Sequence, residues 1–274
     1  MSLTTQVTSR DNPLIQRLRK LSQDPGAYRK MGEIWLEGDH LCSACVARQV
    51  AVDVAVIADT VWLGEGGSGS SVDPLASTLS ALARQAARVV VVAQALWAQF
   101  SGLESPAKLG FLVSAAKLAE ATGSHILAGQ RTVVLDRLQD AGNVGSILRS
   151  ASALGVAQII ALKGTAALWS QKVLRAGMGA HFGLHLVEQV DPEALGRLEM
   201  PLIATSSHAD FALHQAPLPD PCAWVMGHEG QGVGAAVMSQ CALTVSIPQP
   251  GGEESLNVAA ATAVCLYESL RRRL

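Results

Sequence analysis

Five short apolar runs in the second half of this 274-residue chain constrain its fold more than any other feature. They lie at positions 132–135, 158–162, 202–205, 223–226 and 243–247. Runs of this length and composition are typical of strands that are buried on both faces of a parallel sheet. Because helical segments separate them, they predict an α/β domain. General topology rules alone favour an unknotted sheet.

The first hundred residues show a second α/β alternation. Apolar residues at helical spacing predict a helix over 12–21, with Asp11 or Asn12 as the cap and Pro13 in the first turn. We also expect strands at 34–36, 50–61 and 89–92, and helices at 37–49, 74–87 and 96–100. The alternation ends near 101–106. We therefore expect an N-terminal domain over 1–105, a connecting segment over 106–130 and a second domain over 131–274.

Composition places the chain among globular proteins, since 49% of the residues are hydrophobic and 16% are charged. No apolar stretch approaches the roughly 18 residues of a membrane span, and the first residues lack the apolar core of a signal peptide. We expect a cytoplasmic protein with no membrane partner. The composition of the Gly/Ser-rich segment 64–71 predicts a flexible loop. A nucleotide-binding loop is the rejected alternative, because the segment lacks the P-loop lysine and the GxGxxG spacing.

The five cysteines are an odd number without the spacing of a disulfide framework, so we expect them to stay reduced. Cys42 and Cys45 form a CxxC pair that could suggest a redox or zinc site, with His40 adjacent. However, there is no second CxxC, and the pair falls in a run that is expected to be helical. We interpret these thiols as buried and expect no bound metal.

Positive charge is concentrated near the N-terminus, although the net charge of −2 does not itself indicate nucleic-acid binding. The basic residues between positions 10 and 30 are Arg10, Arg17, Arg19, Lys20, Arg29 and Lys30, against only Asp11 and Asp24. A local basic cluster can engage phosphates even on a slightly acidic protein. From charge alone, a solvated helix face explains the same residues.

Three glycine-containing segments carry polar side chains in places suited to a ligand. The first reads NVGSILR at 143–149, and the second reads GHEGQG at 227–232. The third, 246–258, runs from a β-branched strand through Pro and Gly into the helix start at Ser255, Leu256 and Asn257. A glycine turn between a strand and a helix N-terminus presents backbone N–H groups to anionic or polar ligands. Taken singly, each segment also fits a structural role, such as an Asn N-cap followed by a surface Arg.

Taken together, the ordered patterns NxGxxxR, GxExxG and IPxxGxxxSLNV resemble the three signature motifs of the SpoU branch of the SPOUT RNA methyltransferases. The resemblance covers about the last half of the chain. It implies a C-terminal α/β domain whose parallel sheet carries a deep trefoil knot. It also implies a smaller N-terminal α/β domain that is similar in fold to ribosomal protein L30e and binds RNA. The opening SRDNP at 9–13 and the basic helix that follows resemble the start of that domain.

The resemblance implies site residues as well. Backbone groups of Gly227, Ile247 and Leu256 would hold S-adenosylmethionine, and the catalytic set would be Arg149, Asn143, Glu229, Ser255 and Asn257. The residues that would contact RNA are Arg10, Arg17, Arg19, Lys20 and Arg175, although a solvated arginine explains Arg175 equally well. His228 stands where family members more often have Asn, and we interpret it as incidental. Among further departures, Gln249 replaces the usual Met, Ala259 a frequent Ser and Gly177 a common Ser.

The implied activity is S-adenosylmethionine-dependent methylation of a ribose 2′-hydroxyl of RNA. In this family the motif-one arginine, here Arg149, is proposed as general base. Because a guanidinium in a protein stays protonated, phosphate binding and electrostatic stabilisation are the alternative role. The two-domain layout favours ribosomal over transfer RNA. A non-catalytic RNA-binding protein is the second hypothesis, but the chain keeps all five catalytic residues. A dinucleotide-dependent oxidoreductase is the third, and it would need a GxGxxG after the first strand, which the chain lacks.

The expected terminal helix, 255–270, is apolar nearly all round. Such a helix must be buried on more than one face. Relatives pair two subunits through this region, so the resemblance implies a homodimer. The alternative to a dimer is that the N-terminal domain or another helix of the same chain packs on this second face.

Overall fold

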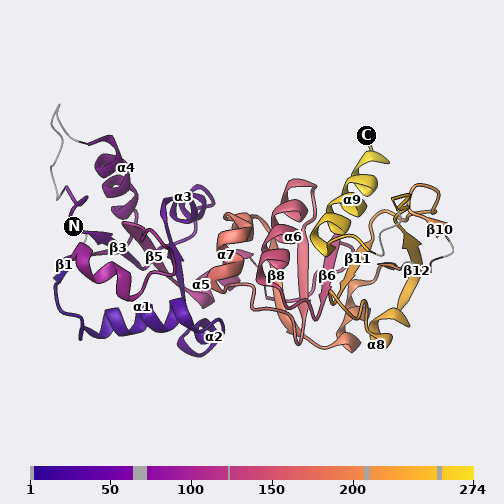
Figure 1. The fold of residues 1–274 in the computed structure, drawn as a ribbon, viewed down its shortest axis with the longest axis horizontal. Helices are drawn as coiled ribbons and strands as arrows, with labels where there is room; N and C mark the ends of the chain where they lie inside the picture. Colours follow the sequence, from indigo (N-terminus) through magenta and orange to yellow (C-terminus); the bar gives the residue numbers. More distant parts are fainter. Residues whose placement is uncertain (1–2, 64–72, 123, 207–208, 210, 252–254) are drawn as a thin grey trace. The chain divides into compact units, whose positions relative to one another are not determined.

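The computed structural model describes residues 3–63, 73–122, 124–206, 209, 211–251 and 255–274. The chain forms two compact units (Figure 1). Unit 1 comprises Met1–Ala121 with Trp169–Arg175, and unit 2 comprises Thr122–Leu168 with Ala176–Leu274. The predicted Gly/Ser-rich loop at 64–71 lies outside the described residues.

Unit 1 is built on a mixed five-stranded sheet in the order β1-β4-β3-β5-β2. Its strands are β1 (Leu3–Val7), β2 (Glu33–Glu37), β3 (Val54–Ala58), β4 (Arg88–Val92) and β5 (Leu109–Ser114). Strands β1, β4 and β3 are parallel, whereas β5 is antiparallel to β3 and β2. The helices are α1 (Pro13–Gln23), α2 (Ala27–Met31), α3 (Asp39–Ala47), α4 (Pro74–Ala83) and the 3-10 helix η1 (Gln94–Gln99). The strands and helices predicted for residues 12–100 are confirmed, and β1 and α2 are additional.

The expected connecting segment 106–130 is wrong in its first part. Strand β5 lies between β3 and β2 in the sheet and is buried over 109–113. Gly110 is required in it, because a Cβ at this position would lie 2.1 Å from Cη2 of Trp35. Helix α5 (Ala115–Thr122) follows directly, and unit 1 continues to Ala121 instead of ending near residue 105. The apolar run after the expected boundary is therefore a core strand of unit 1.

Unit 2 contains a seven-stranded parallel sheet in the order β10-β12-β9-β11-β6-β7-β8. Its strands are β6 (Thr132–Asp136), β7 (Gln158–Leu162), β8 (His185–Val190), β9 (Leu202–Thr205), β10 (Phe211–Ala212), β11 (Ala223–Gly227) and β12 (Cys241–Ser246). The five predicted strands are confirmed, and with them the parallel α/β class. Strands β8 and β10 were not predicted, since β8 includes His, Glu and Gln and β10 has only two residues. The trefoil knot stays a prediction.

The helices that follow these strands are α6 (Ala141–Ala153), α7 (Gln171–Gly177), α8 (Ala235–Met238) and α9 (Val258–Arg271), with the 3-10 helices η2 (Ala180–Gly183) and η3 (Pro192–Leu198). A buried apolar cluster from β6, β7, β9 and β11 forms part of the core. Among the described helices, none combines the length and the hydropathy that crossing a bilayer requires.

Helix α9 packs against α6 and β11 and leaves a second apolar face uncovered. Thr262, Cys265 and Leu266 are buried, whereas Val264 and Tyr267 are 42% and 55% exposed. Within the described part of the chain, the second face that the sequence expects to be buried is therefore open to solvent.

The cysteines behave as structural residues. Cys42 and Cys45 are fully buried in α3, and all five thiols are free. Burial raises the pKa of Cys45 to about 12 and that of Cys42 well above its ordinary value. Thiolate chemistry is thereby suppressed, as the interpretation of the CxxC pair as buried thiols requires.

His181 is a buried histidine whose neutrality links folding to pH. It is fully buried, and its Nε2 donates to the carbonyl of Leu168 at 2.9 Å. A Cβ at Gly177 would lie 2.6 Å from Cε1 of His181, which explains why glycine occupies that position. Desolvation lowers the pKa of His181 to about 4.

We expect His181 to destabilise the fold in mild acid. The unfolded chain takes up a proton near pH 6.5, whereas the folded chain resists it until about pH 4. Stability contributed by the neutral ring is present above pH 6.5 and is lost as pH falls, by about 2 kcal/mol between pH 7 and pH 5. Denaturant titrations at several pH values should show this loss in the free energy of unfolding. His181→Gln keeps a donor to the carbonyl of Leu168, and it should remove the part of the pH dependence that His181 causes. Equal slopes in both proteins would contradict the assignment.

Candidate active site

The candidate site lies where the carboxyl ends of β6 and β11 meet. Gly227 at the end of β11 pairs in register with Asp136 at the end of β6. From β6 the chain proceeds outward through β7 to β8, and β9 then lies on the far side of β11. Such a reversal of strand order is where open α/β sheets bind ligands. Motif one follows β6, motif two follows β11 and motif three follows β12.

Asn143 is not the N-cap of α6. Asp140 caps the helix, and its Oδ1 accepts from the backbone N of Asn143 at 2.7 Å. The Asn143 side chain is therefore available for other contacts. The Glu229 carboxylate also faces this helix start, since its oxygens accept from the backbone N of Asp140 at 3.2 Å and of Gln139 at 3.4 Å. A carboxylate is stabilised by amides at such a position.

A chain of side-chain hydrogen bonds joins the three motifs. The Asn143 amide donates to Oε1 of Glu229 at 3.3 Å. The Asn257 amide donates to Oδ1 of Asn143 at 2.9 Å, while Oδ1 of Asn257 caps α9 by accepting from the backbone N of Ala259 and Ala260. We call Glu229, Asn143 and Asn257 the motif relay. Residues 114 positions apart thus meet through their side chains.

Glu229 is held as a carboxylate. Partial burial opposes its ionisation. Hydrogen bonds from its own backbone N–H, from the Asn143 side chain and from the backbone of Asp140 and Gln139 outweigh that effect and lower its pKa below the ordinary value. The group is therefore an acceptor at neutral pH, not a proton donor.

The segment 227–234, here called the glycine turn, folds back tightly on itself. A Cβ at Gly227 would lie 2.2 Å from both the carbonyl carbon of Gly232 and the backbone N of Val233. Nδ1 of His228 accepts from the backbone N of Gly230 at 3.0 Å and of Gln231 at 3.3 Å. His228 therefore shapes the turn, and the interpretation that it is incidental to catalysis stays a prediction. An Asn side chain makes equivalent bonds in Asx turns, which is a signal that sequence analysis could have used.

A cavity of about 170 Å³ adjoins motif three. It is lined by Thr205, Ser206, Ile247, Gln249, Ser255, Leu256 and Ala261. Ile247 and Leu256, two of the three residues expected to hold the cofactor, line this cavity together with Ser255 from the expected catalytic set, whereas Gly227 does not line it. Oε1 of Gln249 is buried and has no hydrogen-bond partner among the described residues. A buried acceptor of this kind is suited to a donor on a bound ligand.

Arg149 lies on α6 outside the motif relay. It is exposed and lies six residues, less than two helical turns, beyond Asn143. Within the described parts of the chain, no hydrogen bond or ion pair holds its guanidinium. It is therefore free to contact a ligand, unlike the relay residues, whose polar groups are engaged.

The expected RNA-binding residues differ in availability. Arg19 donates from Nε to the carbonyl of Gln99 and from Nη2 to Oε1 of Gln99, and Arg17 forms an ion pair with Glu33 at 3.3 Å. In the same unit, Arg175 donates to the carbonyl of Gly102 at 3.3 Å. Arg10 and Lys20 are exposed. Part of the basic cluster therefore stabilises unit 1, because the guanidinium groups of Arg17 and Arg19 are bound by residues of the same unit that are distant in sequence.

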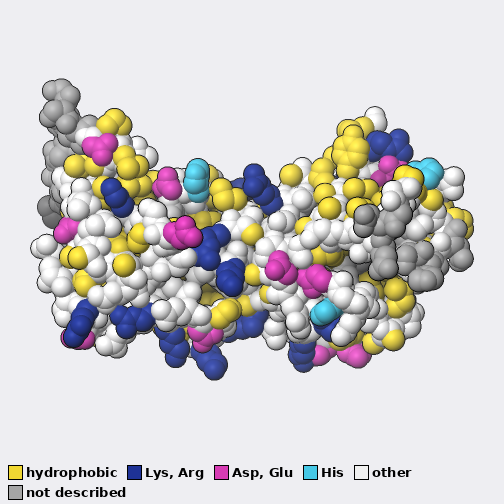
Figure 2. Space-filling view, in the orientation of Figure 1, with side chains coloured by type: hydrophobic (Ala, Val, Ile, Leu, Met, Phe, Trp, Pro, Cys, Tyr) yellow, Lys and Arg dark blue, Asp and Glu magenta, His cyan; other side chains and the backbone are white. Residues whose placement is uncertain are grey.

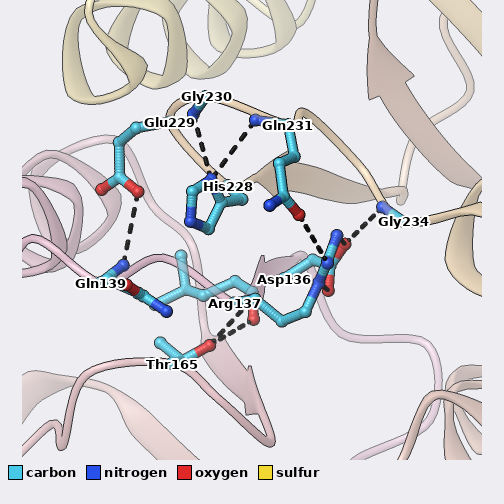
Figure 3. A network of polar contacts seen from close by, with 10 residues as sticks. Asp136, Arg137, Gln139, Thr165, His228, Glu229, Gly230, Gln231 and Gly234 are labelled. Atoms are coloured by element: carbon cyan, nitrogen blue, oxygen red, sulfur yellow. Dashed lines mark hydrogen bonds and ion pairs between the residues drawn. The ribbon is translucent and has the colours of Figure 1, made fainter.

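A second polar network, formed by Asp136 and Arg137 and not predicted from the sequence, lies beside the glycine turn (Figure 3). Asp136 is 2% exposed, and its Oδ2 accepts from the backbone N of Gly234 at 2.6 Å. Arg137 donates to the same carboxylate from Nε and Nη2 and to Oε1 of Gln231 from Nη1. The hydrogen bonds and charge of Asp136 raise the pKa of Arg137. The only sequence signal is an acidic residue at a strand end.

Comparison with known proteins extends this geometry. The SpoU rRNA Methylase family model matches residues 130–267. An uncharacterized tRNA/rRNA methyltransferase of Synechocystis sp. is 31% identical over 271 residues, which cover 97% of this chain and 94% of that protein. The 23S rRNA (guanosine-2′-O-)-methyltransferase RlmB of Salmonella typhi is 33% identical over 145 residues, which cover 52% of this chain and 60% of RlmB. The match to RlmB thus spans less than two thirds of that relative.

A solved structure agrees over nearly the whole chain. The crystal structure of an RNA 2′-O ribose methyltransferase has a TM-score of 0.75 and 26% sequence identity, and the match covers 98% of this chain and 99% of that one. The fold described above, including both units, is therefore shared with a ribose methyltransferase.

Proposed function

This chain belongs to the SpoU rRNA Methylase family, and from that membership we propose that it methylates a ribose 2′-hydroxyl of RNA with S-adenosylmethionine as methyl donor. The observation that carries the proposal is the motif relay, in which Glu229, Asn143 and Asn257 are hydrogen-bonded at the carboxyl edge of the sheet. Ribosomal RNA is the proposed substrate in preference to transfer RNA. Unit 1 is the proposed RNA-gripping domain.

The cavity beside motif three fits the cofactor. Backbone groups of Ile247 and Leu256 would hold its adenosine part, with Gly227 at the end of β11, and the buried Oε1 of Gln249 offers an acceptor that lacks a partner among the described residues. When bound, S-adenosylmethionine supplies a methyl group activated by a sulfonium. The residues of the chain have only to orient this group and the ribose.

Arg149 is the proposed contact to the reacting nucleotide. Its exposed guanidinium would bind the phosphate beside the target ribose and stabilise negative charge that develops on the 2′-oxygen. A guanidinium does not readily accept a proton, so the proton leaves to phosphate or water. The relay residues keep the start of α6, and hence Arg149, in register with the glycine turn.

Transfer of labelled methyl groups tests this function. The protein is incubated with S-adenosylmethionine labelled in the methyl group and with purified ribosomal or transfer RNA that lacks modification, and the RNA is digested to nucleosides. We expect label in a 2′-O-methylnucleoside from ribosomal RNA. Label on a base, or none in either RNA, would contradict the proposal.

Exposed lysines of unit 1 should contribute RNA affinity. Figure 2 shows Lys and Arg side chains gathered along the side of unit 1 where α1 and α2 lie. Lys20 and Lys30 are exposed, and no described residue forms an ion pair with either. Replacing both by Ala should weaken RNA binding and reduce the slope of log Kd against log salt by about 1 to 2. The control is Lys163→Ala, which removes a lysine that forms an ion pair in unit 2. An unchanged salt slope in the double variant would show that Lys20 and Lys30 belong to a solvated helix face and do not contact RNA.

We also propose a homodimer through α9. A cavity of about 440 Å³ beside this helix is lined by Leu213, His214, Ile247, Pro248, Ala263, Val264, Tyr267 and Glu268. Figure 2 shows hydrophobic side chains gathered on α9, and an apolar patch of this kind favours association. Ile247 also lines the cavity beside motif three, so a partner seated here would adjoin the cofactor site.

Light scattering should give a mass of twice 28.6 kDa for the wild type at micromolar concentration. Val264→Glu should yield a folded monomer, because an interfacial charge without a partner is costly to bury. Leu75→Glu, which alters an exposed apolar residue of unit 1, should leave the mass unchanged. An active wild-type monomer would rule the dimer out.

A further inference from the structure

The charged pair at the carboxyl end of β6 has a geometry suited to holding the glycine turn. We propose that Asp136 and Arg137 are positioning residues that clamp this turn and so maintain the cofactor-binding conformation of Gly227 and the position of Glu229. The inference rests on the proposed function, because it concerns the same site. It adds two residues that none of the three motifs contains.

The first arm of the clamp is Asp136. Its carboxylate is nearly fully buried and receives three N–H groups: the backbone N of Gly234 at 2.6 Å, Nε of Arg137 at 3.0 Å and Nη2 of Arg137 at 3.3 Å. A buried carboxylate is costly unless it is paired and hydrogen-bonded. The carboxylate therefore ties the end of the glycine turn to the end of β6.

The second arm is the guanidinium of Arg137. Its Nη1 donates to Oε1 of Gln231 at 3.3 Å, in the middle of the turn (Figure 3). Glu229, two residues earlier, is bound by the backbone of Gln139 and Asp140. The segment 136–140 thus grips the glycine turn at residues 229, 231 and 234. Loss of the two clamp contacts would leave the turn attached to this segment, among the described residues, by the sheet pairing of Gly227 with Asp136 and by the hydrogen bonds of Glu229.

The surroundings of Arg137 are fitted to it. Its backbone φ is +59°, in the left-handed region that residues other than glycine rarely adopt. Its backbone N donates to Oγ1 of Thr165 at 3.1 Å, and that hydroxyl donates to the carbonyl of Leu135. A Cβ at Gly164 would lie 3.3 Å from Cγ of Arg137, and one at Gly234 would lie 2.9 Å from its Nη2. Unusual backbone geometry that several contacts maintain is typical of functional sites.

A purely stabilising ion pair is the alternative, and β6 itself offers the comparison. Arg131 precedes the other end of this strand and binds Asp220 through Nε at 2.8 Å and Nη2 at 2.9 Å. It has no contact with the glycine turn among the described residues. Arg131→Ala therefore removes a bidentate pair with similar hydrogen-bond distances from the opposite end of β6, and it serves as the matched control for Arg137→Ala.

Two measurements on the full chain test the clamp. Calorimetric titration with S-adenosylhomocysteine should show a Kd at least roughly ten-fold higher for Arg137→Ala, an intermediate value for Arg137→Lys, and a change below about two-fold for Arg131→Ala. Hydrogen exchange without ligand should be roughly ten-fold faster in peptides of the glycine turn for Arg137→Ala only. If Arg137→Ala does not fold, Gln231→Ala is the second variant, because it removes the contact with Nη1 of Arg137. It should still raise the Kd for S-adenosylhomocysteine and the exchange rate of the glycine turn.

The clamp would be overturned if Arg137→Ala bound S-adenosylhomocysteine with wild-type affinity and its glycine turn exchanged hydrogen at the wild-type rate. It would also be overturned if Arg131→Ala lost as much affinity as Arg137→Ala. A wild-type protein that does not bind S-adenosylhomocysteine would contradict the proposed function instead. In that case the exchange measurement still decides whether Arg137 holds the turn.

Discussion

Replacement of Arg149 by Ala should reduce methyl transfer by roughly 10²- to 10³-fold, which is the typical cost of removing one group that stabilises charge in a transition state. Cofactor affinity should change by less than about two-fold, because the cavity is lined by residues at the end of β9, in motif three and in α9, and Arg149 does not line it. The fold should persist as well, since the side chain is exposed and makes no polar contact with any described residue.

Single-turnover transfer with saturating RNA and titration with S-adenosylhomocysteine separate these effects. Arg149→Lys keeps the positive charge but loses the bidentate fork, so we expect partial recovery of the rate. Arg197→Ala, an exposed arginine of unit 2 outside the motifs, should transfer methyl groups at the wild-type rate. If Arg149→Ala also did so on a verified substrate, the assigned role would be wrong.

Gly227→Ala should have a comparably large effect, but on the cofactor. The added Cβ would meet the backbone of Gly232 and Val233 at 2.2 Å, and backbone atoms cannot rotate away as a flexible side chain can. The glycine turn must therefore open. We expect the Kd for S-adenosylhomocysteine to rise by at least roughly 10²-fold, as when a site is displaced by about 1 Å.

The control for this substitution is Gly196→Ala, where a Cβ meets nothing within 4 Å. Both variants are compared by calorimetric titration and by thermal unfolding. Gly196→Ala should bind with wild-type affinity. A Gly227→Ala protein that is folded and binds equally well would show that the turn has no part in the cofactor site.

Most of the sheet could be predicted because its strands are apolar runs with helical segments between them. The runs at 132–135 and 223–226 became the two central strands that carry the site. Strand β1 was missed because Val7 is the only buried residue among its described side chains, and Thr4, Thr5 and Gln6 are polar. Strand β5 was assigned to a linker because the composition of 101–106 was interpreted as a domain edge. Local sequence does not reveal which sheet an apolar run will join.

The site was predictable where a motif encodes it and not where tertiary contacts do. The motifs named Asn143, Glu229 and Asn257, and their side chains are hydrogen-bonded in one chain. The clamp depends on Arg137 in a left-handed conformation, on a buried carboxylate and on a backbone N–H 98 residues away. None of these is visible in the local sequence. The same holds for Arg19, whose partner Gln99 is 80 residues distant.

Mapping of 2′-O-methylated nucleotides in cellular RNA tests whether this protein methylates ribosomal RNA. Ribosomal and transfer RNA are compared between cells with the protein, cells without it, and cells without it that express either the wild type or Arg149→Ala. We expect that one ribose methylation in ribosomal RNA disappears without the protein, returns with the wild type and does not return with the variant. Identical methylation maps in all four strains would contradict it.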